Sequence, residues 1–177
     1  EKNIPLLYLE AGDIISSPEL RFELFNPPEA GKLFQGTPSD LNNNSLVFRL
    51  TAGETTFLFT GDAEEAAEEY MLKSGFDLNS QVLKVGHHGA RSSSGEEFLE
   101  AVRPNVAVIQ VGRNSFGHPS AQTLERLEDN GSLIYSTDLH GAVTVRIKGD
   151  RFWVTPFKKQ ENPSSKKVVN NPVSLTP

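Results

Sequence analysis

The chain has 177 residues, with 17 Lys or Arg against 23 Asp or Glu, which gives a formal net charge of −6. This length suits one domain or part of one, and the negative charge excludes avid nucleic-acid binding driven by bulk charge, although a local basic groove is still compatible with it. Because there is no cysteine, disulfides, thiolate metal sites and cysteine nucleophiles are excluded. No apolar run approaches the ~18 residues of a membrane helix, so we expect a soluble piece excised from a longer protein.

The first half of the chain predicts three strands. Residues 20–25 alternate apolar and charged side chains, as a half-buried strand does. Residues 31–44 are rich in Gly, Pro and Asn and predict a loop. Strands are expected at 45–50 and 55–60, joined by a short turn. The second of these is apolar on both faces at Phe57-Leu58-Phe59, which favours a central strand covered on both sides.

Three strand–helix units follow. The first helix, 63–73, has apolar residues at i, i+3, i+4, i+7 and i+8. The next helix, 95–102, is expected to begin with Ser94 and Glu97 in capping-box spacing. The remaining elements are strands at 81–85, 106–111 and 133–135, a helix at 121–128, and a hairpin of 143–148 with 152–155. The pattern predicts an α/β protein.

The last twenty residues, 158–177, contain three Pro, three Asn and three Ser and no aromatic residue. Such a segment cannot bury enough surface to offset its ordering entropy. Residues 161–177 carry a net charge of +1, so residues 1–160 carry −7. We predict a domain over 1–157 and a flexible tail over 158–177.

Polar residues follow the carboxyl end of each parallel strand, where ligands of α/β sheets bind. Without cysteine, Asp and His are the available ligands for a divalent ion. We expect all four histidines and two aspartates at one rim: Asp62 after 55–60, His87 and His88 after 81–85, His118 after 106–111, and Asp138 and His140 after 133–135.

Each of these positions has a second interpretation. Asp62, followed by Glu65, also fits a helix N-cap. The pair His87-His88 lies between two glycines, where the backbone turns tightly or approaches a ligand closely, and this favours metal binding. His118 suits either a turn before a helix or a site, and His140 suits plain surface placement. The run Asn42-Asn43-Asn44 is most simply a solvated turn.

Five segments occur in an order and spacing typical of a known family: LNNNSLVFRL (41–50), FLFTGDAE (57–64), LKVGHHGARSSS (83–94), VAVIQVGRNSFGHPSAQTLERL (106–127) and YSTDLHGAVTV (135–145). Together they resemble the second half of the metallo-β-lactamase-like domain of the ComEC family, the channels for DNA uptake in natural competence. The resemblance covers about residues 6–155. It implies half of an αββα sandwich, with βα units followed by a C-terminal β-hairpin.

The resemblance also implies roles for single residues. Asp62 matches the carboxylate that bridges two metals, Zn or Mn, and His88 matches a metal-binding histidine, with His87 as the alternative. His118 matches a loop that binds the phosphate or the leaving group. No role is carried to His140, where the family has an ordinary turn residue.

Two more positions are implied to line the site. Asn42 and Ser45 fall where the ComEC-like group carries an Asn-rich segment in place of a histidine. The motif H-x-H-x-D-H, which supplies the first ligands of the fold, does not occur in this chain. Since a catalytic zinc needs about three protein ligands, we expect the chain alone to bind metal weakly and to be inactive.

The implied activity is metal-dependent hydrolysis of a phosphodiester, on single-stranded DNA, during competence-linked uptake. Arg91 and Arg113 are candidates for phosphate contacts. The implied setting is the extracytoplasmic side of a bacterial membrane, where the rest of the polypeptide contributes a channel. Two rival readings are a metal-free binding or structural module of such a channel and a same-fold hydrolase of another ester, such as a phosphocholine esterase or a lactonase.

Two structural predictions follow. Asp62 and His88 should lie on one rim, close enough to share a metal, with His118 farther along the cleft and His140 at its margin or outside. If Asp62 is instead an N-cap, its carboxylate should turn onto the amides of Glu64 and Glu65. Strands that lack their partners should leave an exposed edge or apolar face, through which the chain would self-associate, aggregate or dimerise.

Overall fold

A seven-stranded sheet forms the centre of the computed structural model, which describes residues 5–158 and 173–175. The strands lie in chain order across the sheet; the first four are antiparallel, and the fourth to the seventh are parallel. They are β1 (Ile14–Ser16), β2 (Leu20–Asn26), β3 (Val47–Ala52), β4 (Thr55–Phe59), β5 (Val82–Lys84), β6 (Val106–Ile109) and β7 (Leu133–Ser136).

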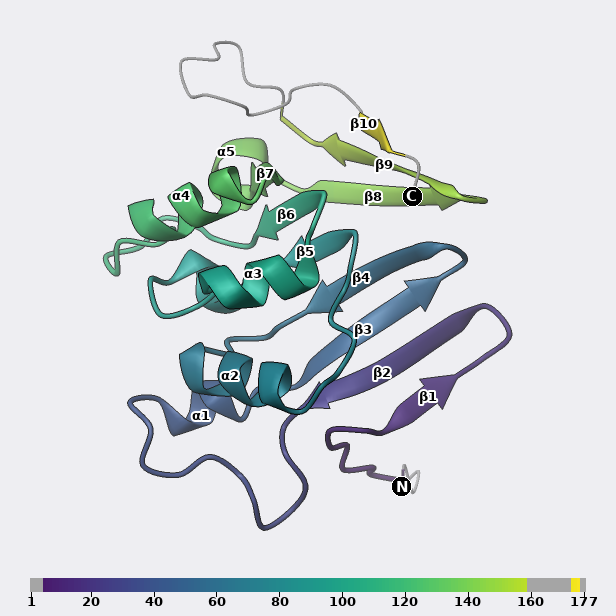
Figure 1. Cartoon of the computed structure of the whole chain (residues 1–177). Helices are drawn as coiled ribbons and strands as arrows, with labels where there is room; N and C mark the ends of the chain where they lie inside the picture. The colour runs from purple at the N-terminus through teal and green to yellow at the C-terminus, as the bar shows by residue number, and fades with distance from the viewer. Residues whose placement is uncertain (1–4, 159–172, 176–177) are drawn as a thin grey trace, which may run out of the picture.

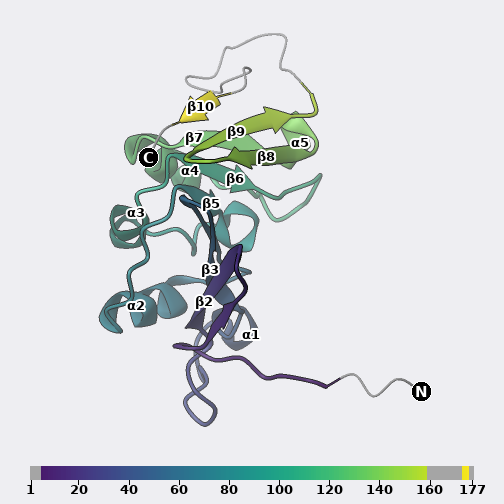
Figure 2. The same ribbon diagram turned by 90° about the vertical axis from the view of Figure 1, so that its right-hand side faces the viewer.

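Three helices join the parallel strands and cover one face of this sheet (Figures 1 and 2). They are α2 (Glu65–Lys73), α3 (Glu96–Val102) and α4 (Ala121–Asp129). Their apolar sides form the main core with Leu58 and Leu83 of the sheet, and each helix contributes one of Met71, Phe98 and Leu127. Short helical segments lie at α1 (Asp40–Asn43), at α5 (Thr137–His140) and at a 3₁₀ turn, Gly86–Gly89.

A second, smaller sheet lies on the opposite face. Its strands are β8 (Val143–Lys148), β9 (Arg151–Pro156) and β10 (Val173–Leu175), in the order β10-β9-β8. Phe152 and Val154 of β9 pack against Val82, Val106 and Tyr135 of the large sheet. This sheet therefore covers β5 to β7 and reaches Phe57 of β4. Among the described residues, it leaves most of the same face of β2 to β4 uncovered (Figures 1 and 2).

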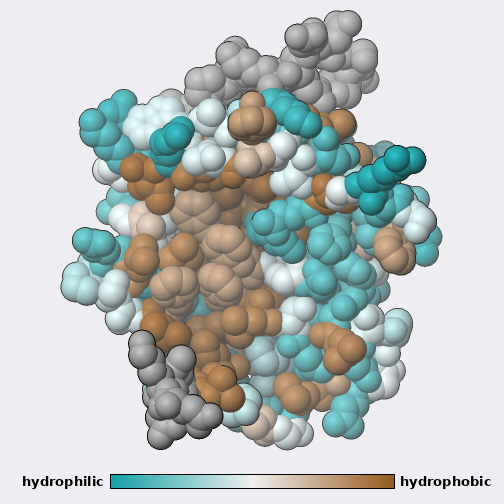
Figure 3. Space-filling view, turned by 180° about the vertical axis from the view of Figure 1, so that it is seen from behind, coloured by the Kyte–Doolittle hydropathy of each residue, from teal (hydrophilic) through white to brown (hydrophobic). Residues whose placement is uncertain are grey.

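Aromatic rings occupy that uncovered face. The Phe22 and Phe48 ring centroids are 5.8 Å apart, and those of Phe48 and Phe59 are 5.0 Å apart. The view from behind shows a broad apolar surface over these strands (Figure 3). Ile15, which pairs with Phe22 on the neighbouring strand, is 43% exposed. The sequence analysis expected an exposed apolar face; association of two chains through it stays a prediction.

The predicted strands and helices agree with the structure to within about two residues at most ends, and the α/β class is confirmed. The 31–44 segment, predicted as loop, contains α1, and β1 was not predicted. The predicted capping box of Ser94 and Glu97 is wrong. The N-cap residue of α3 is Gly95, and no side chain of that residue forms a capping hydrogen bond. Most of the predicted tail lies outside the described residues; within it, Val173–Leu175 pairs with β9.

Candidate functional site

The loops after β4 and β5 meet at the carboxyl end of the sheet, because these two strands pair in parallel. The His87 amide donates a hydrogen bond to the Gly61 carbonyl at 3.2 Å. The Lys84 ammonium donates to the same carbonyl at 2.6 Å. The turn that carries Asp62 is thus joined directly to the turn that carries His87 and His88.

Asp62 has a half-exposed carboxylate at this junction. Its side chain is 41% exposed, and Oδ1 lies 4.0 Å from the Lys84 ammonium. Its backbone amide donates to the Ser45 hydroxyl at 3.1 Å, which fixes the turn. Burial lowers the pKa of Lys84, and the nearby Asp62 charge opposes that shift. Ser45 therefore contacts the backbone of Asp62; that it lines a substrate site stays a prediction.

The N-cap interpretation of Asp62 is wrong. The N-cap position of α2 is Glu64. The side-chain oxygen of Asn43, from α1, accepts hydrogen bonds from the amides of Glu64 and Ala67 at 3.2 and 3.1 Å. The Glu65 amide donates to the Ser92 carbonyl. Because Asn43 does the capping, the Asp62 carboxylate is left for other partners.

His87 is held by a carboxylate that the sequence analysis did not select. Its Nδ1 lies 2.8 Å from Glu64 Oε1, and the Asn42 amide donates to the same oxygen at 2.8 Å. A carboxylate oxygen in this position favours a proton on Nδ1, and in the neutral ring Nε2 then keeps its lone pair. Asn42 thus lies beside His87, with its Nδ2 also 3.4 Å from His87 Nδ1; that it lines a substrate site stays a prediction.

His88 is oriented in the same way by the backbone. Its Nδ1 donates to the Gln110 carbonyl at 2.6 Å, so its Nε2 is also free to bind a ligand. Both residues have left-handed backbone conformations, with φ of 42° for His87 and 55° for His88. Such conformations cost about 1–3 kcal/mol per non-glycine residue and persist mainly where function or the surroundings require them.

His118 lies beside this pair. Its ring centroid is 5.4 Å from that of His87, and Phe116 stacks on it at 5.9 Å. Burial, together with the charges that His87 and His88 can carry, lowers the pKa of His118. Its Nδ1 is buried and has no hydrogen-bond partner in the part of the chain that the structure describes. His118 is therefore a mostly neutral imidazole at neutral pH.

His140 does not belong to this group, and its predicted surface placement is wrong. The residue is 1% exposed. Its Nδ1 lies 3.0 Å from both the amide nitrogen and the carbonyl oxygen of Ser136, and its ring lies 5.4 Å from that of Tyr135. Its ring lies beside Tyr135, which belongs to the cluster that β9 forms with the large sheet, and packing between such distant segments has no local sequence signal.

A complete metal site is not formed by the described residues, among which no three His, Asp or Glu side chains lie in an arrangement that could hold an ion. Asp62, His87 and His88 have the oxygen and nitrogen atoms that Zn²⁺ or Mn²⁺ binds, but they do not make up a full set. That Asp62 and His88 share an ion stays a prediction.

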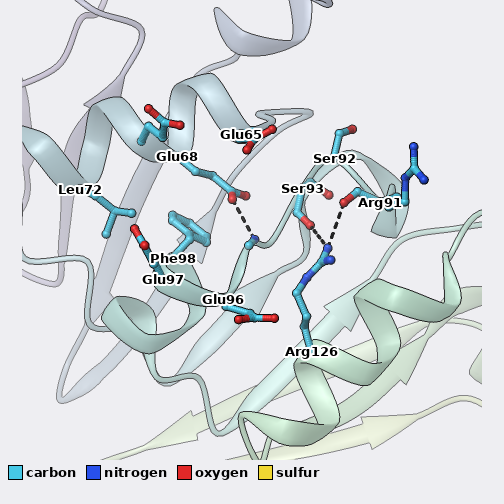
Figure 4. Close-up of a pocket in the computed structure, with 12 residues that line it drawn as sticks. Glu65, Glu68, Leu72, Arg91, Ser92, Ser93, Glu96, Glu97, Phe98 and Arg126 are labelled. Atoms are coloured by element: carbon cyan, nitrogen blue, oxygen red, sulfur yellow. Dashed lines mark hydrogen bonds between the residues drawn. The ribbon is translucent and has the colours of Figure 1, made fainter.

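A cavity of about 420 Å³ lies elsewhere, between α2, α3 and α4 (Figure 4). Glu68 lines it and accepts hydrogen bonds from the Ser94 and Gly95 amides at 2.5 and 2.9 Å. Arg126 donates to the carbonyls of Ser93 and Ser94. Burial raises the pKa of Glu68 to about 7, against the opposing effect of the two amides. None of the histidines lines this cavity, and its several glutamates do not suit a phosphate.

Sequence reasoning missed Glu64, Lys84 and Phe116. Lys84 had a usable signal, since it is the one charged residue in the otherwise apolar run Val82–Val85 that leads into the histidine pair. Glu64 had none, because it is one of several acidic residues at a helix start, and only the fold shows which one meets a histidine.

Comparison with known proteins shows the family of the chain. Residues 6–113 match the metallo-beta-lactamase superfamily. The chain is 30% identical over 149 residues to ComE operon protein 3 of Bacillus subtilis (strain 168), covering 84% of this chain and 18% of that protein. It is 36% identical over 149 residues to competence protein ComA of Neisseria gonorrhoeae, covering 80% of this chain and 21% of that protein.

A third relative is recombination protein 2 of Haemophilus influenzae (strain ATCC 51907 / DSM 11121 / KW20 / Rd). It is 33% identical over 129 residues, which cover 72% of this chain and 16% of that protein. The chain thus spans about a fifth of the length of the relatives that it matches. Within the described ranges, no helix has the length and apolar character needed to cross a membrane.

Proposed function

The chain belongs to the metallo-β-lactamase superfamily and matches a part of ComEC-type competence proteins, and from this premise we propose that it supplies part of a metal-dependent phosphodiesterase site that acts on DNA. The observation that carries the proposal is the junction of the two turns after β4 and β5. There, Asp62 keeps a half-exposed carboxylate, while His87 and His88 keep their Nε2 atoms free.

In this proposal, Asp62 and the Nε2 atom of His88 are metal ligands, with His87 as the alternative histidine. Because the described residues do not complete a metal site, the remaining ligands in this proposal come from beyond the described residues. A bound divalent ion of this kind lowers the pKa of a coordinated water and neutralises charge on a phosphodiester.

The residues of this chain have preparatory tasks that need no metal. The Gln110 carbonyl holds the His88 ring in the tautomer whose Nε2 is a ligand. Ser45 fixes the backbone of Asp62, and Lys84 brings a positive charge within 4.0 Å of its carboxylate. These contacts orient the groups before any ligand arrives, which reduces the entropy that binding has to overcome.

His118 has the position for a second task. It is mostly neutral, because its pKa is lowered, and it lies next to His87. A neutral imidazole donates one hydrogen bond, so His118 can bind an oxygen of the phosphate or of the leaving group. The net charge of −6 disfavours unaided binding of DNA, and exposed Arg91 and Arg113 are the proposed local phosphate contacts.

The setting is part of the same proposal. The relatives named for competence are several times longer than this chain, so we infer that the domain works within a larger bacterial membrane protein, on its extracytoplasmic side. Its substrate there is single-stranded DNA during uptake. A second copy of the chain, bound through the aromatic face of β2 to β4, is a proposed partner of the isolated domain.

The test compares Asp62→Asn and His88→Ala with Asp138→Asn in the full-length protein. Asp138 is exposed and follows β7 at the same end of the sheet, so it serves as a matched control. We expect the first two variants to lower Mn²⁺-dependent cleavage of single-stranded DNA roughly 100-fold, since a lost metal ligand removes several kcal/mol of transition-state stabilisation. The control should keep its rate.

The isolated chain gives a second readout. Calorimetry should show weak binding of Mn²⁺ or Zn²⁺, weakened further by Asp62→Asn, and little nuclease activity. Robust DNA cleavage by the 177 residues alone would contradict the proposed division of the site. Unchanged cleavage in the full-length Asp62 and His88 variants would favour the metal-free module, and faster turnover of a phosphocholine ester or a lactone than of DNA would favour another substrate.

A further inference from the structure

Phe116 has a large apolar side chain that is exposed to solvent. It lies on the loop between β6 and α4, four residues beyond Gly112, and it is 81% exposed. Single exposed apolar residues are common on protein surfaces, so exposure alone does not indicate a binding role. Two features distinguish Phe116: the hydrogen bonds that hold its loop and the stacking of its ring on His118.

The loop is fixed by one side chain, Asn114. Its Oδ1 accepts hydrogen bonds from the amides of Phe116 and His118 at 3.0 and 3.1 Å. Its Nδ2 donates to the carbonyls of Gly112 and His118 at 2.9 and 2.8 Å. All four bonding positions of the amide are therefore in use. The backbone under Phe116 is ordered in advance, and a ligand that binds there does not have to order it.

The ring of Phe116 continues a row of rings that leads into the candidate site. It lies nearly parallel to the His118 ring, at 19° and 5.9 Å between centroids. The His118 ring in turn lies 5.4 Å from His87. One face of Phe116 is thus turned toward the residue that we propose to bind the phosphate, and its high exposure leaves ring surface open to solvent.

We propose that Phe116 is a stacking platform for an unpaired nucleobase next to the phosphate that His118 binds; this rests on the proposed function. A nucleotide carries a flat ring beside each phosphate, and stacking on an aromatic side chain stabilises binding of such a ring whatever the base. A base in a duplex has both faces covered by its neighbours, so only single-stranded DNA offers a free face. Arg113, on the same loop and exposed, supplies a cation for the adjoining backbone.

The platform would make the site prefer single strands without reading their sequence. Stacking gives that preference because every base has a π-face. The side-chain amide of Asn114 is already bonded to the loop backbone, so it does not select one base. A partner protein that covers Phe116 would use the same apolar surface, but it would not require a planar ring opposite the phenyl group.

The experiment measures binding in EDTA, so that it does not depend on cleavage. Fluorescence anisotropy compares a short labelled oligothymidylate, an abasic strand of the same length, and a duplex, for the wild type and for Phe116→Ala, Phe116→Leu and Phe116→Trp. We expect Phe116→Ala and Phe116→Leu to bind the oligothymidylate about tenfold more weakly, and the abasic strand and the duplex as the wild type does. Leu is the matched control, since it is apolar but cannot stack.

Phe116→Trp adds a direct signal. Its tryptophan emission should be quenched by the oligothymidylate and not by the abasic strand, against the wild type, in which Trp153 is the single tryptophan. Equal losses for the normal and abasic strands, full affinity in Phe116→Leu, or no quenching would each overturn the platform. Stacking in EDTA without Mn²⁺-dependent cleavage in the full-length protein would reject the proposed function alone, and cleavage with no effect of Phe116 on binding would reject the platform alone.

Discussion

Two glutamates one helical turn apart, at the start of α2, belong to regions of different character. Glu64 reaches toward the histidine rim, where its carboxylate meets His87 and Asn42. Glu68 reaches toward α3, where its carboxylate meets only the backbone amides of Ser94 and Gly95. Both carboxylates are largely buried.

The difference lies in what remains free after these bonds form. At the α2–α3 junction, each oxygen of the Glu68 carboxylate accepts a hydrogen bond from one backbone amide, and both groups serve to hold α3 against α2. At the rim, the bond from Glu64 engages one nitrogen of His87 and leaves the other available. A functional region is thus marked less by burial or charge than by polar groups that are oriented but not fully used. The predictions below separate the two regions.

The largest effect is expected from Glu68→Ala. The substitution leaves two amides at the start of α3 without acceptors in a buried position, and each unsatisfied group costs about 1–3 kcal/mol. We expect the free energy of unfolding to fall by roughly 3 kcal/mol, measured by urea denaturation. A loss below about 0.5 kcal/mol would mean that water or a rearranged loop satisfies these amides.

The dependence on pH provides the control. The pKa of Glu68 is raised to about 7 in the folded state, from 4.5, so the folded chain binds the proton more tightly than the unfolded chain. The resulting stabilisation is fully present below pH 4.5 and is lost as the pH rises through about 7. Glu68→Gln does not titrate, so the stability difference between wild type and this variant should shrink over that interval. A constant difference would contradict the raised pKa.

A smaller effect is expected from Asn43→Ala. Asn43 caps α2 through the amides of Glu64 and Ala67, and loss of such a cap costs about 0.5–2 kcal/mol. The matched control is Asn42→Ala, one position earlier, because that side chain contacts Glu64 and His87 and caps nothing. Thermal denaturation should therefore separate these neighbours, with Asn42→Ala close to wild type. Equal losses would show that the capping bond is not what α1 contributes.

The contrast between these two asparagines shows how far sequence reasoning reaches. The strands and helices could be predicted because their signals are local: the apolar run of Phe57–Phe59 and the alternation of residues 143–148 are visible within a few residues. The run Asn42-Asn43-Asn44 was predicted as a solvated turn, since nothing nearby reveals that Asn43 points at a helix 21 residues farther on.

The candidate site divides in the same way. Asp62 and His88 could be chosen because they follow strands that had been predicted and match a known pattern of residues. Glu64 could not be chosen, since its partner His87 lies 23 residues away and is reached only when β4 and β5 pair. The burial of His140 required the packing of β9 against Tyr135, which is likewise a contact between distant segments.

The smallest effect on stability, but a specific one on the rim, is expected from Glu64→Ala. Without the carboxylate, nothing in the described contacts requires His87 to carry its proton on Nδ1, and the ring should populate both neutral tautomers. Nitrogen-15 chemical shifts of the imidazole report the tautomer directly.

We expect the wild type to show Nδ1–H at His87, Glu64→Ala to show a mixture, and Glu68→Gln to match the wild type. His88 should keep its tautomer in all three proteins, because the Gln110 carbonyl holds it independently of Glu64. If His87 is already a mixture in the wild type, Glu64 does not orient it, and the rim would lose the feature that distinguishes it from the α2–α3 junction.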